Sequence, residues 1–311
     1  MPTTHETETP VGLREGTVGR DWAHAQVRLP QGTIRYRDTG SGEPIVFVHG
    51  LLVNGELWRK VVPPLAGEFR CIVPDLPLGS HRAPMEASAE LSPPGVARLV
   101  SEFLAALDLD RVTLVGNDTG GAICQLVAAH HPDRLAKLVL TPCDAYENFL
   151  PPAFRPLQYA ARVPGLIAAL IQGGRIGAIR RGPLGIGLLT KRRPIDDEVL
   201  QGYLRPFLED RRVRRDALKV LRGISNRQTL EAAQILRHSD LPTLIVWARE
   251  DRFFKLRFAR RLAAELPNAR LIEIDDSFTF VPEDQPDRLA ELIAGFVRES
   301  PRAPREEGAS G

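Results

Sequence analysis

Residues 112–126 read VTLVGNDTGGAICQL, and this stretch predicts a strand, a sharp turn and a helix in immediate succession. The first four residues are β-branched or apolar, as in a buried strand, and apolar residues recur at helical spacing from Ile123 onward. Glycines stand two residues before and two residues after Asp118, where a larger side chain would collide with the backbone of so tight a turn. The pattern therefore predicts a turn that holds Asp118 exposed at the C-terminal edge of a sheet.

Buried strands and helices alternate on both sides of this stretch. Short β-rich runs at 26–29 and 33–37 predict a hairpin. Continuous apolar runs, typical of strands buried on both faces, and segments of helical spacing follow in turn. The expected strands are 44–48, 71–73, 135–140, 244–247 and 270–274, and the expected helices are 57–65, 93–107, 257–266 and 288–297. This order predicts the α/β class, with a mostly parallel, doubly wound sheet.

The rhythm changes between residues 144 and 240, where strand-like runs stop and apolar residues at helical spacing alternate with Pro and Gly breaks. We therefore expect a helical cap over 144–240, inserted into a core formed by 23–143 and 241–298. The polar segments at 1–22 and 299–311 are expected to be flexible tails.

The composition limits the classes of function. The 311 residues have a formal net charge of +2 and are 43% hydrophobic, which is typical neither of a basic nucleic-acid-binding chain nor of a disordered acidic one. No run approaches the roughly 18 consecutive apolar residues of a membrane span. The three cysteines lie in or beside apolar runs, as buried reduced thiols do. We expect a cytoplasmic monomer or homodimer that binds neither nucleic acid nor membrane and holds no metal.

The order of motifs resembles that of the α/β-hydrolase superfamily over residues 26–297. Besides the turn around Asp118, its marks are His49-Gly50 after the third strand, an Asp75-centred loop after the fourth, an insertion after the sixth and Glu250-Asp251 after the seventh. An aspartate at the turn is similar to the branch that holds haloalkane dehalogenases and epoxide hydrolases, where a carboxylate attacks carbon. The resemblance implies the α/β-hydrolase fold, a small-molecule substrate and no cofactor.

The resemblance implies that Asp118 is the nucleophile and that the backbone N–H groups of Leu51 and Thr119 form an oxyanion hole. A desolvated carboxylate can displace a halide or open an epoxide at an sp³ carbon. Water must then hydrolyse the resulting ester, which requires a general base oriented by an acid. Two aspartates could be that acid. We favour Asp251, after the seventh strand, over Asp144, after the sixth, whose other interpretation is a helix N-cap.

The position of the base departs from the family pattern. Members of the family usually have Asp-Ser-Gly-His-Phe after the eighth strand, whereas residues 276–280 read DSFTF, which places Thr279 where the histidine belongs. Threonine cannot take up a proton at neutral pH, so the ester-hydrolysing step loses its usual base. His81, on a loop at the same edge, is the histidine that could replace it. His49 is expected to stabilise the oxyanion turn.

Two further departures concern the substrate. Related dehalogenases have Asn and Trp at the positions of Leu51 and Thr119, and the N–H groups of those side chains hold the leaving halide. Related epoxide hydrolases have Pro at the position of Leu52 and use cap tyrosines to protonate the opened oxygen. The tyrosines of the cap region are Tyr146, Tyr159 and Tyr203, and tyrosine in a cap more often serves packing than catalysis.

Three functions therefore stay open. The first is hydrolysis through attack of Asp118 on carbon, with an incomplete triad. The second is a non-hydrolytic reaction, such as a cyclisation, elimination or isomerisation, in which Asp118 acts as acid or base. The third is a non-catalytic pocket that binds a ligand, which the retained Asp118 and Asp251 disfavour.

Overall fold

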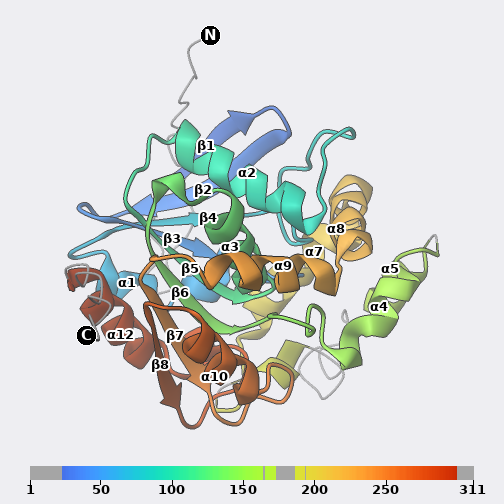
Figure 1. Ribbon diagram of the computed structural model, residues 1–311. Helices are drawn as coiled ribbons and strands as arrows, with labels where there is room; N and C mark the ends of the chain where they lie inside the picture. Colours follow the sequence, from blue (N-terminus) through green and yellow to red (C-terminus); the bar gives the residue numbers. More distant parts are fainter. Residues whose placement is uncertain (1–22, 164, 173–185, 193, 300–311) are drawn as a thin grey trace, which may run out of the picture.

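The computed structural model describes residues 23–163, 165–172, 186–192 and 194–299, and apart from Glu299 the expected tails lie outside these residues. Eight strands form one sheet in the order β1-β2-β4-β3-β5-β6-β7-β8 (Figure 1). The strands are β1 (Ala23–Leu29), β2 (Gly32–Thr39), β3 (Pro44–Val48), β4 (Arg70–Pro74), β5 (Val112–Asp118), β6 (Leu135–Cys143), β7 (Thr243–Ala248) and β8 (Ala269–Ile274).

The directions of the strands bring the functional loops to one edge. β2 pairs antiparallel with both β1 and β4, and it forms the expected hairpin with β1. The remaining neighbours, from β4 through β3 and β5 to β8, pair in parallel. The mostly parallel sheet expected from the alternation of strands and helices is therefore confirmed. Because parallel strands end at the same edge, the segments after β3, β5, β6, β7 and β8 meet there.

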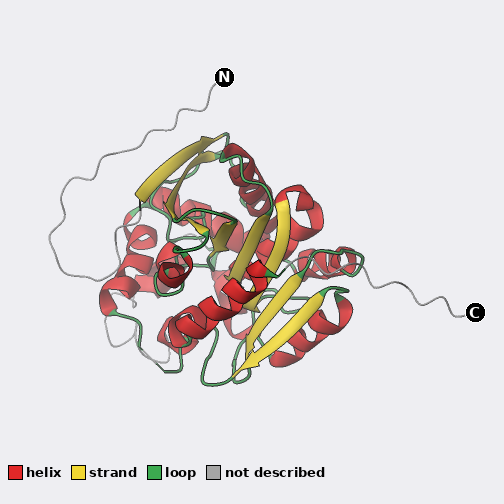
Figure 2. Cartoon of the chain, turned by 90° about the vertical axis from the view of Figure 1, so that its left-hand side faces the viewer, coloured by secondary structure: helices red, strands yellow, loops and turns green. Residues whose placement is uncertain are grey.

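Helices cover both faces of the sheet (Figure 1, Figure 2). Val46 and Val48 pack in an apolar cluster with α2, α3, α9 and α10, whereas Ile45 and Phe47 pack in another with α1 and α12. Alternation of side chains along a buried strand produces these two cores. The helices are α1 (Val62–Leu65), α2 (Pro93–Ala106), α3 (Thr119–His130), α10 (Leu256–Glu265), α11 (Val281–Asp284) and α12 (Pro286–Arg298), with short 3-10 turns η1 (Gly55–Trp58) and η2 (Pro132–Arg134).

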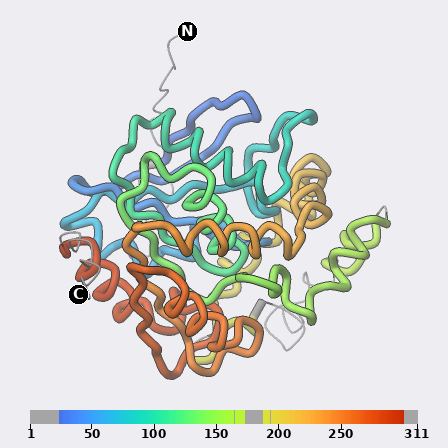
Figure 3. Tube along the Cα trace, in the orientation of Figure 1, coloured from blue at the N-terminus to red at the C-terminus, as the bar shows by residue number. Residues whose placement is uncertain are grey.

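The segment between β6 and β7 is helical in its described parts. Figure 3 shows the chain running outward through α4 and α5 and returning through α7 and α8. Its elements are η3 (Pro152–Phe154), α4 (Arg155–Ala160), α5 (Leu166–Gln172), η5 (Ile186–Leu189), α7 (Asp197–Glu209), α8 (Arg211–Gly223) and α9 (Asn226–Leu236). α9 packs along α3, so residues 226–236 cover the core, although helical periodicity alone had placed them in the cap.

A third apolar cluster lies between the insertion and the edge of the sheet. It joins Phe149 and Phe207 of the insertion to Ala122 of α3, and the partly exposed Leu51 and Leu52 pack against it. This cluster gives the edge that holds Asp118 an apolar surrounding. Within the described ranges, no helix combines the length and the apolar character that crossing a bilayer requires.

The turn between β5 and α3 depends on two glycines. A Cβ atom on Gly116 would lie 2.7 Å from the Sγ atom of Cys124. A Cβ atom on Gly120 would lie 2.5 Å from the carbonyl oxygen of Val48 and closer still to that of His49. The first turn of α3 therefore rests directly on the end of β3, which is why the sequence requires glycine on both sides of Asp118.

Replacement of Gly120 should destabilise the fold strongly. Gly120→Ala is expected to lower the free energy of unfolding by about 3 kcal/mol, because the methyl group overlaps backbone that cannot move without separating α3 from β3. Gly295→Ala, in α12 with no atom within 4 Å of the added carbon, is the matched control and should raise stability by about 0.5–1 kcal/mol. Urea unfolding of both variants measures the difference, and equal midpoints would contradict this account.

Candidate active site

Asp118 is the strained residue at the centre of the edge. It ends β5 and precedes α3 with φ 55° and ψ −135°, a conformation that costs a non-glycine residue about 1–3 kcal/mol. The residue lies deep in the molecule yet keeps part of its surface exposed, as do Leu51 and Leu52. The predicted turn thus leaves the carboxylate partly exposed at the edge of the sheet.

Two backbone N–H groups converge on the carboxylate of Asp118. Burial raises the pKa of Asp118 to about 7, although the N–H groups of Thr119 and Leu51 donate to the carboxylate and oppose the rise. The charge of Asp251 adds to the rise in pKa. Both donors are the ones that sequence resemblance assigned to the oxyanion hole, and both point into one small region.

Asp251 and Thr279 lie side by side at this edge. Asp251 follows β7, and its Oδ1 atom accepts hydrogen bonds of 2.7 Å from the N–H groups of Phe253 and Phe254. Burial raises the pKa of Asp251 to about 6, and the nearby Thr279 hydroxyl opposes that rise. Thr279 is fully buried, and neither its Oγ1 atom nor Asp251 Oδ2 has a hydrogen bond of normal geometry among the described residues.

Asn117 fixes the loop of Thr279 to the elbow, a role that sequence reasoning missed. Its Nδ2 atom donates to the carbonyl oxygen of Thr279 at 2.8 Å and to Oγ1 of Thr141 at 2.8 Å. Asn117 is fully buried within β5, directly before Asp118. An amide side chain directly before Asp118, at the end of a buried strand, was the available signal for this contact.

Asp144 follows β6 and has hydrogen-bond partners of its own. Its Oδ1 atom accepts from the N–H group of Leu150 at 2.8 Å, and Oδ2 accepts from the hydroxyl of Thr119 at 3.3 Å. Burial, followed by the charge of Asp118, raises the pKa of Asp144 well above its ordinary value. The structure therefore brings Asp251, and not Asp144, next to Thr279. Asp144 instead holds the loop by which the chain enters the insertion.

The two candidate histidines have both ring nitrogens engaged. His49 Nε2 accepts from the N–H group of Leu76 at 2.9 Å, and Nδ1 lies 2.9 Å from the carbonyl oxygen of Gly50. Burial lowers the pKa of His49 to about 4, so it is neutral and holds the oxyanion turn.

His81 Nδ1 accepts from the N–H group of Gly79 at 3.4 Å, and Nε2 lies 3.3 Å from Asp216 of α8. His81 thus joins its loop to the insertion, and both of its ring nitrogens already have partners other than Asp118.

The three tyrosines of the insertion differ in their surroundings. The hydroxyl of Tyr146 donates to Glu265 at 2.9 Å, and the guanidinium of Arg261 stacks 3.8 Å above its ring. Burial and the hydrogen bond to Glu265 raise the pKa of Tyr146. Tyr159 is 64% exposed, whereas Tyr203 is fully buried among apolar residues on α7. The geometry therefore gives Tyr146 a structural role.

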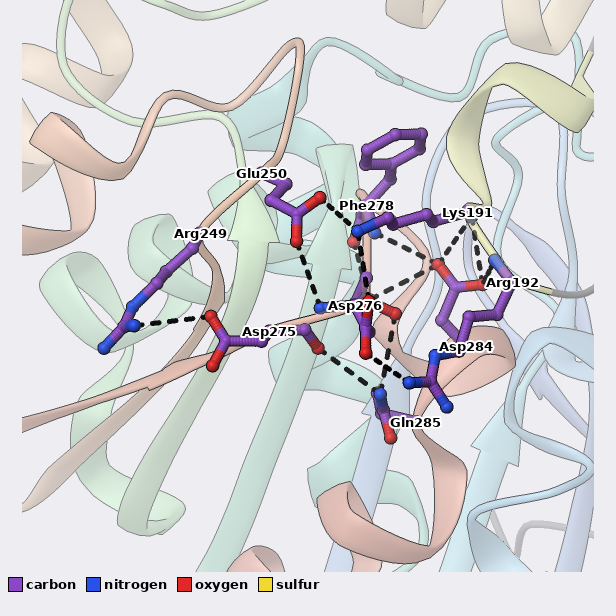
Figure 4. A network of polar contacts seen from close by, with 10 residues as sticks. Lys191, Arg192, Arg249, Glu250, Asp275, Asp276, Phe278, Asp284 and Gln285 are labelled. Carbon is purple, nitrogen blue, oxygen red and sulfur yellow. Dashed lines mark hydrogen bonds and ion pairs between the residues drawn. The ribbon is translucent and has the colours of Figure 1, made fainter.

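Polar contacts fasten the loop at 275–280 to the insertion (Figure 4). The buried carboxylate of Asp284 accepts from the N–H groups of Lys191 and Arg192 at 2.9 Å and from that of Phe278 at 3.0 Å. One carboxylate thus joins two segments that lie far apart in the sequence. No spacing in the sequence indicated this contact.

The same network reaches the loop of Asp251. The ammonium group of Lys191 pairs with both Glu250 and Asp276, and the N–H group of Asp276 donates to Glu250 at 3.3 Å. The guanidinium of Arg252 stacks 4.4 Å from the ring centroid of Phe278. The loops after β7 and β8 are therefore held together by the contacts of Lys191, Glu250 and Asp276, which Figure 4 shows, and by the stacking of Arg252 on Phe278.

The assembled groups can perform carboxylate chemistry. Asp118 combines partial exposure with two N–H donors, and two further buried carboxylates, Asp144 and Asp251, lie near it. Within the described ranges, no cluster of three or more His, Cys, Asp or Glu side chains is arranged to bind a metal ion. The three cysteines are buried with free thiols. The site therefore offers a nucleophile or proton carrier at Asp118 and donors for a developing oxyanion.

Removal of the Asp118 charge should stabilise the protein in a pH-dependent way. The pKa of Asp118 in the folded state, about 7, exceeds its ordinary value of 3.8, so the ionised group destabilises the fold above pH 7 and this cost disappears toward pH 4. Asp118→Asn should raise the free energy of unfolding at pH 8 by about 1–2 kcal/mol. Urea unfolding between pH 4 and 8 measures the gain. Asp276→Asn, which removes an exposed ion-paired carboxylate, is the control and should show no such gain.

The sequence is similar to those of known proteins. Residues 43–171 match the family of the α/β hydrolase fold. The chain is 29% identical over 281 residues to haloalkane dehalogenase 2 of Mycobacterium bovis, with 85% of this chain and 91% of the relative covered. It is 27% identical over 283 residues to the cis-3-alkyl-4-alkyloxetan-2-one decarboxylase of Shewanella oneidensis, with 86% of each chain covered.

A solved structure agrees with the sequence relatives. The haloalkane dehalogenase DatA from Agrobacterium tumefaciens C58 superposes with a TM-score of 0.72 at 25% identity, covering 88% of this chain and 96% of that chain. The chain is thus an enzyme of the α/β-hydrolase fold whose relatives include haloalkane dehalogenases.

Proposed function

We propose that the protein acts in the cytoplasm, as a monomer or homodimer, on a small organic substrate whose sp³ carbon is attacked by Asp118. The observation that supports this most is the carboxylate itself: it stands on a strained turn, is partly exposed, and accepts hydrogen bonds from the N–H groups of Leu51 and Thr119. A strained, buried charge of this kind has no use in packing. Relatives named as haloalkane dehalogenases support the same chemistry.

The first step forms an ester. One oxygen of Asp118 bonds to the carbon while the bond from that carbon to its leaving group breaks, and the bonding electrons depart with the leaving group. An alkyl halide releases halide, and an epoxide opens to an alkoxide that takes a proton from solvent. Burial favours attack because a carboxylate stripped of water is a stronger nucleophile.

The residues around Asp118 shape the choice of substrate. Leu51 and Thr119 contribute N–H groups of the backbone only, so the halide-binding amide and indole of typical dehalogenases are missing. The apolar cluster of Phe149, Phe207 and Leu52 would instead surround an apolar substituent. We therefore expect small apolar electrophiles rather than charged ones.

A second candidate function is supported by the protonation state of Asp118. A pKa of about 7 leaves both the acid and the carboxylate accessible at neutral pH, as an acid–base catalyst needs. Thr279 stands where hydrolysis would require an imidazole. One relative is named as a decarboxylase, which is an activity other than hydrolysis. In this candidate Asp118 moves a proton within the substrate, and no ester forms.

Trapping of the ester tests the first candidate. Incubation with a panel of alkyl bromides and terminal epoxides should add one alkyl group to the intact protein, and peptide mapping should place it on Asp118. Asp118→Asn, which keeps all three cysteines, should remain unmodified, because an amide is a poor nucleophile. A panel that leaves the wild-type protein unmodified and unreacted would contradict attack by Asp118.

Labelled water separates the two candidates. When a substrate that is turned over is supplied in H₂¹⁸O, hydrolysis through the ester should deliver ¹⁸O to the product after the first turnover, because label enters Asp118 when the ester is cleaved. Acid–base catalysis should deliver none, while still failing in Asp118→Asn. Mass spectrometry of the product reads the difference.

A further inference from the structure

Two buried oxygens lie near one another at the edge of the sheet, and the Thr279 hydroxyl is close enough to lower the pKa of Asp251 as a weak hydrogen-bond donor. Asp251 Oδ2 and Thr279 Oγ1 lack a hydrogen bond of normal geometry among the described residues, although Asp251 is only 5% exposed and Thr279 is fully buried. Leaving a buried polar atom unpaired costs free energy, because its hydrogen bonds to water are lost and not replaced. Two such atoms at one spot indicate a binding position for a small group that both accepts and donates hydrogen bonds.

The rest of Asp251 is fixed in a way that leaves Oδ2 available. Its Oδ1 atom is occupied by the N–H groups of Phe253 and Phe254, which set the orientation of the carboxylate. In a triad the other oxygen would accept the N–H group of an imidazole. Thr279 has a short hydroxyl in place of an imidazole, so a donor smaller than an imidazole could occupy the position next to Oδ2 of Asp251.

We propose that Asp251 is itself the general base that cleaves the Asp118 ester, acting on one water molecule held between its Oδ2 atom and the hydroxyl of Thr279. This inference rests on the proposed ester at Asp118. The water would stand in the place of the imidazole, with Thr279 as its anchor and Asp251 as its proton acceptor.

The charges around Asp251 fit this role. Burial raises the pKa of Asp251 to about 6, which makes it a stronger base than an ordinary carboxylate while it stays ionised at neutral pH. Lys255, on the loop of Asp251, opposes the rise, and Asp118 faces it from the elbow. Once Asp118 is esterified its charge is gone, so Asp251 is the ionised member of the facing pair when hydrolysis begins.

The step balances without another reactant. The water oxygen bonds to the ester carbonyl carbon of Asp118 while its proton passes to Asp251, and the N–H groups of Leu51 and Thr119 hold the oxyanion. Collapse breaks the bond between that carbon and the ester oxygen, and the departing alkoxide takes the proton back from Asp251. The acid formed at Asp118 then loses its proton to solvent, which restores both carboxylates.

Asp251→Asn tests the inference, because the amide keeps an oxygen to accept from Phe253 and Phe254 while Oδ2 becomes a group that cannot take a proton. The alkylated protein is freed of excess reagent, and loss of the adduct is followed by intact mass between pH 5 and 9. In wild type the decay rate should rise with pH through about 6 and then level. Asp251→Asn should still form the adduct, but the decay should slow by about 100-fold or more and lose this pH dependence.

Variants of Thr279 test the anchor separately. Thr279→Val preserves shape and burial but removes the hydroxyl, so decay should slow by about tenfold through loss of one hydrogen bond to the water. Thr279→Ser restores the hydroxyl and should recover most of the lost rate. Circular dichroism confirms that each variant is folded before its adduct is measured.

The outcomes are distinguishable. Decay of the adduct in Asp251→Asn at the wild-type rate and pH dependence would overturn the role of Asp251 and leave the ester intact as a finding. Equal decay in wild type and Thr279→Val would overturn the placement of the water. Absence of any adduct in wild type and in Asp251→Asn would overturn the proposed function, and this inference with it.

Discussion

The site depends on a carboxylate that the fold holds in an unfavourable place. Asp118 combines a left-handed backbone conformation with depth in the molecule, and both cost free energy. Contact of Gly120 with the end of β3 leaves the chain no alternative path. The N–H groups of Leu51 and Thr119 offset part of the electrostatic cost but not all of it, because the pKa still lies near 7. The stability of the packed sheet thus offsets the cost of holding the Asp118 carboxylate in a strained and buried place, where it is more reactive than in water.

The carboxylates of Asp144 and Asp251, on the loops around Asp118, repel its negative charge. Asp144 and Asp251 each raise the energy of an ionised Asp118, and each is held by N–H groups rather than by a cation. At neutral pH this arrangement favours any event that removes one charge from the group. Formation of an ester at Asp118 is such an event, and so is uptake of a proton. The electrostatics therefore favours reaction at Asp118 without deciding which reaction occurs.

Local sequence patterns predicted the strands and the turn around Asp118, but they could not predict contacts between residues that lie far apart in the sequence. The strands and the turn around Asp118 follow from side-chain size and periodicity within a few residues, which the sequence displays directly. Asn117 meets the carbonyl of Thr279 across 162 positions, and His81 meets Asp216 across 135, so neither partner could be read from spacing. The insertion could be recognised as helical, but nothing in its periodicity showed that α9 packs on α3.

The threonine at position 279 stands in a loop that is otherwise fully fastened. Asn117 holds its carbonyl, Asp284 holds the N–H group of Phe278, and the N–H group of Phe280 donates to the carbonyl of Leu189 at 2.8 Å. Among the buried atoms of the described residues that lack a hydrogen bond of normal geometry are Oδ2 of Asp251, Oγ1 of Thr279 and Oδ1 of Asn117, although the backbone of this loop is well held. The loop thus keeps a position for one small polar molecule. Binding there would give hydrogen-bond partners to the buried oxygens of Asp251 and Thr279.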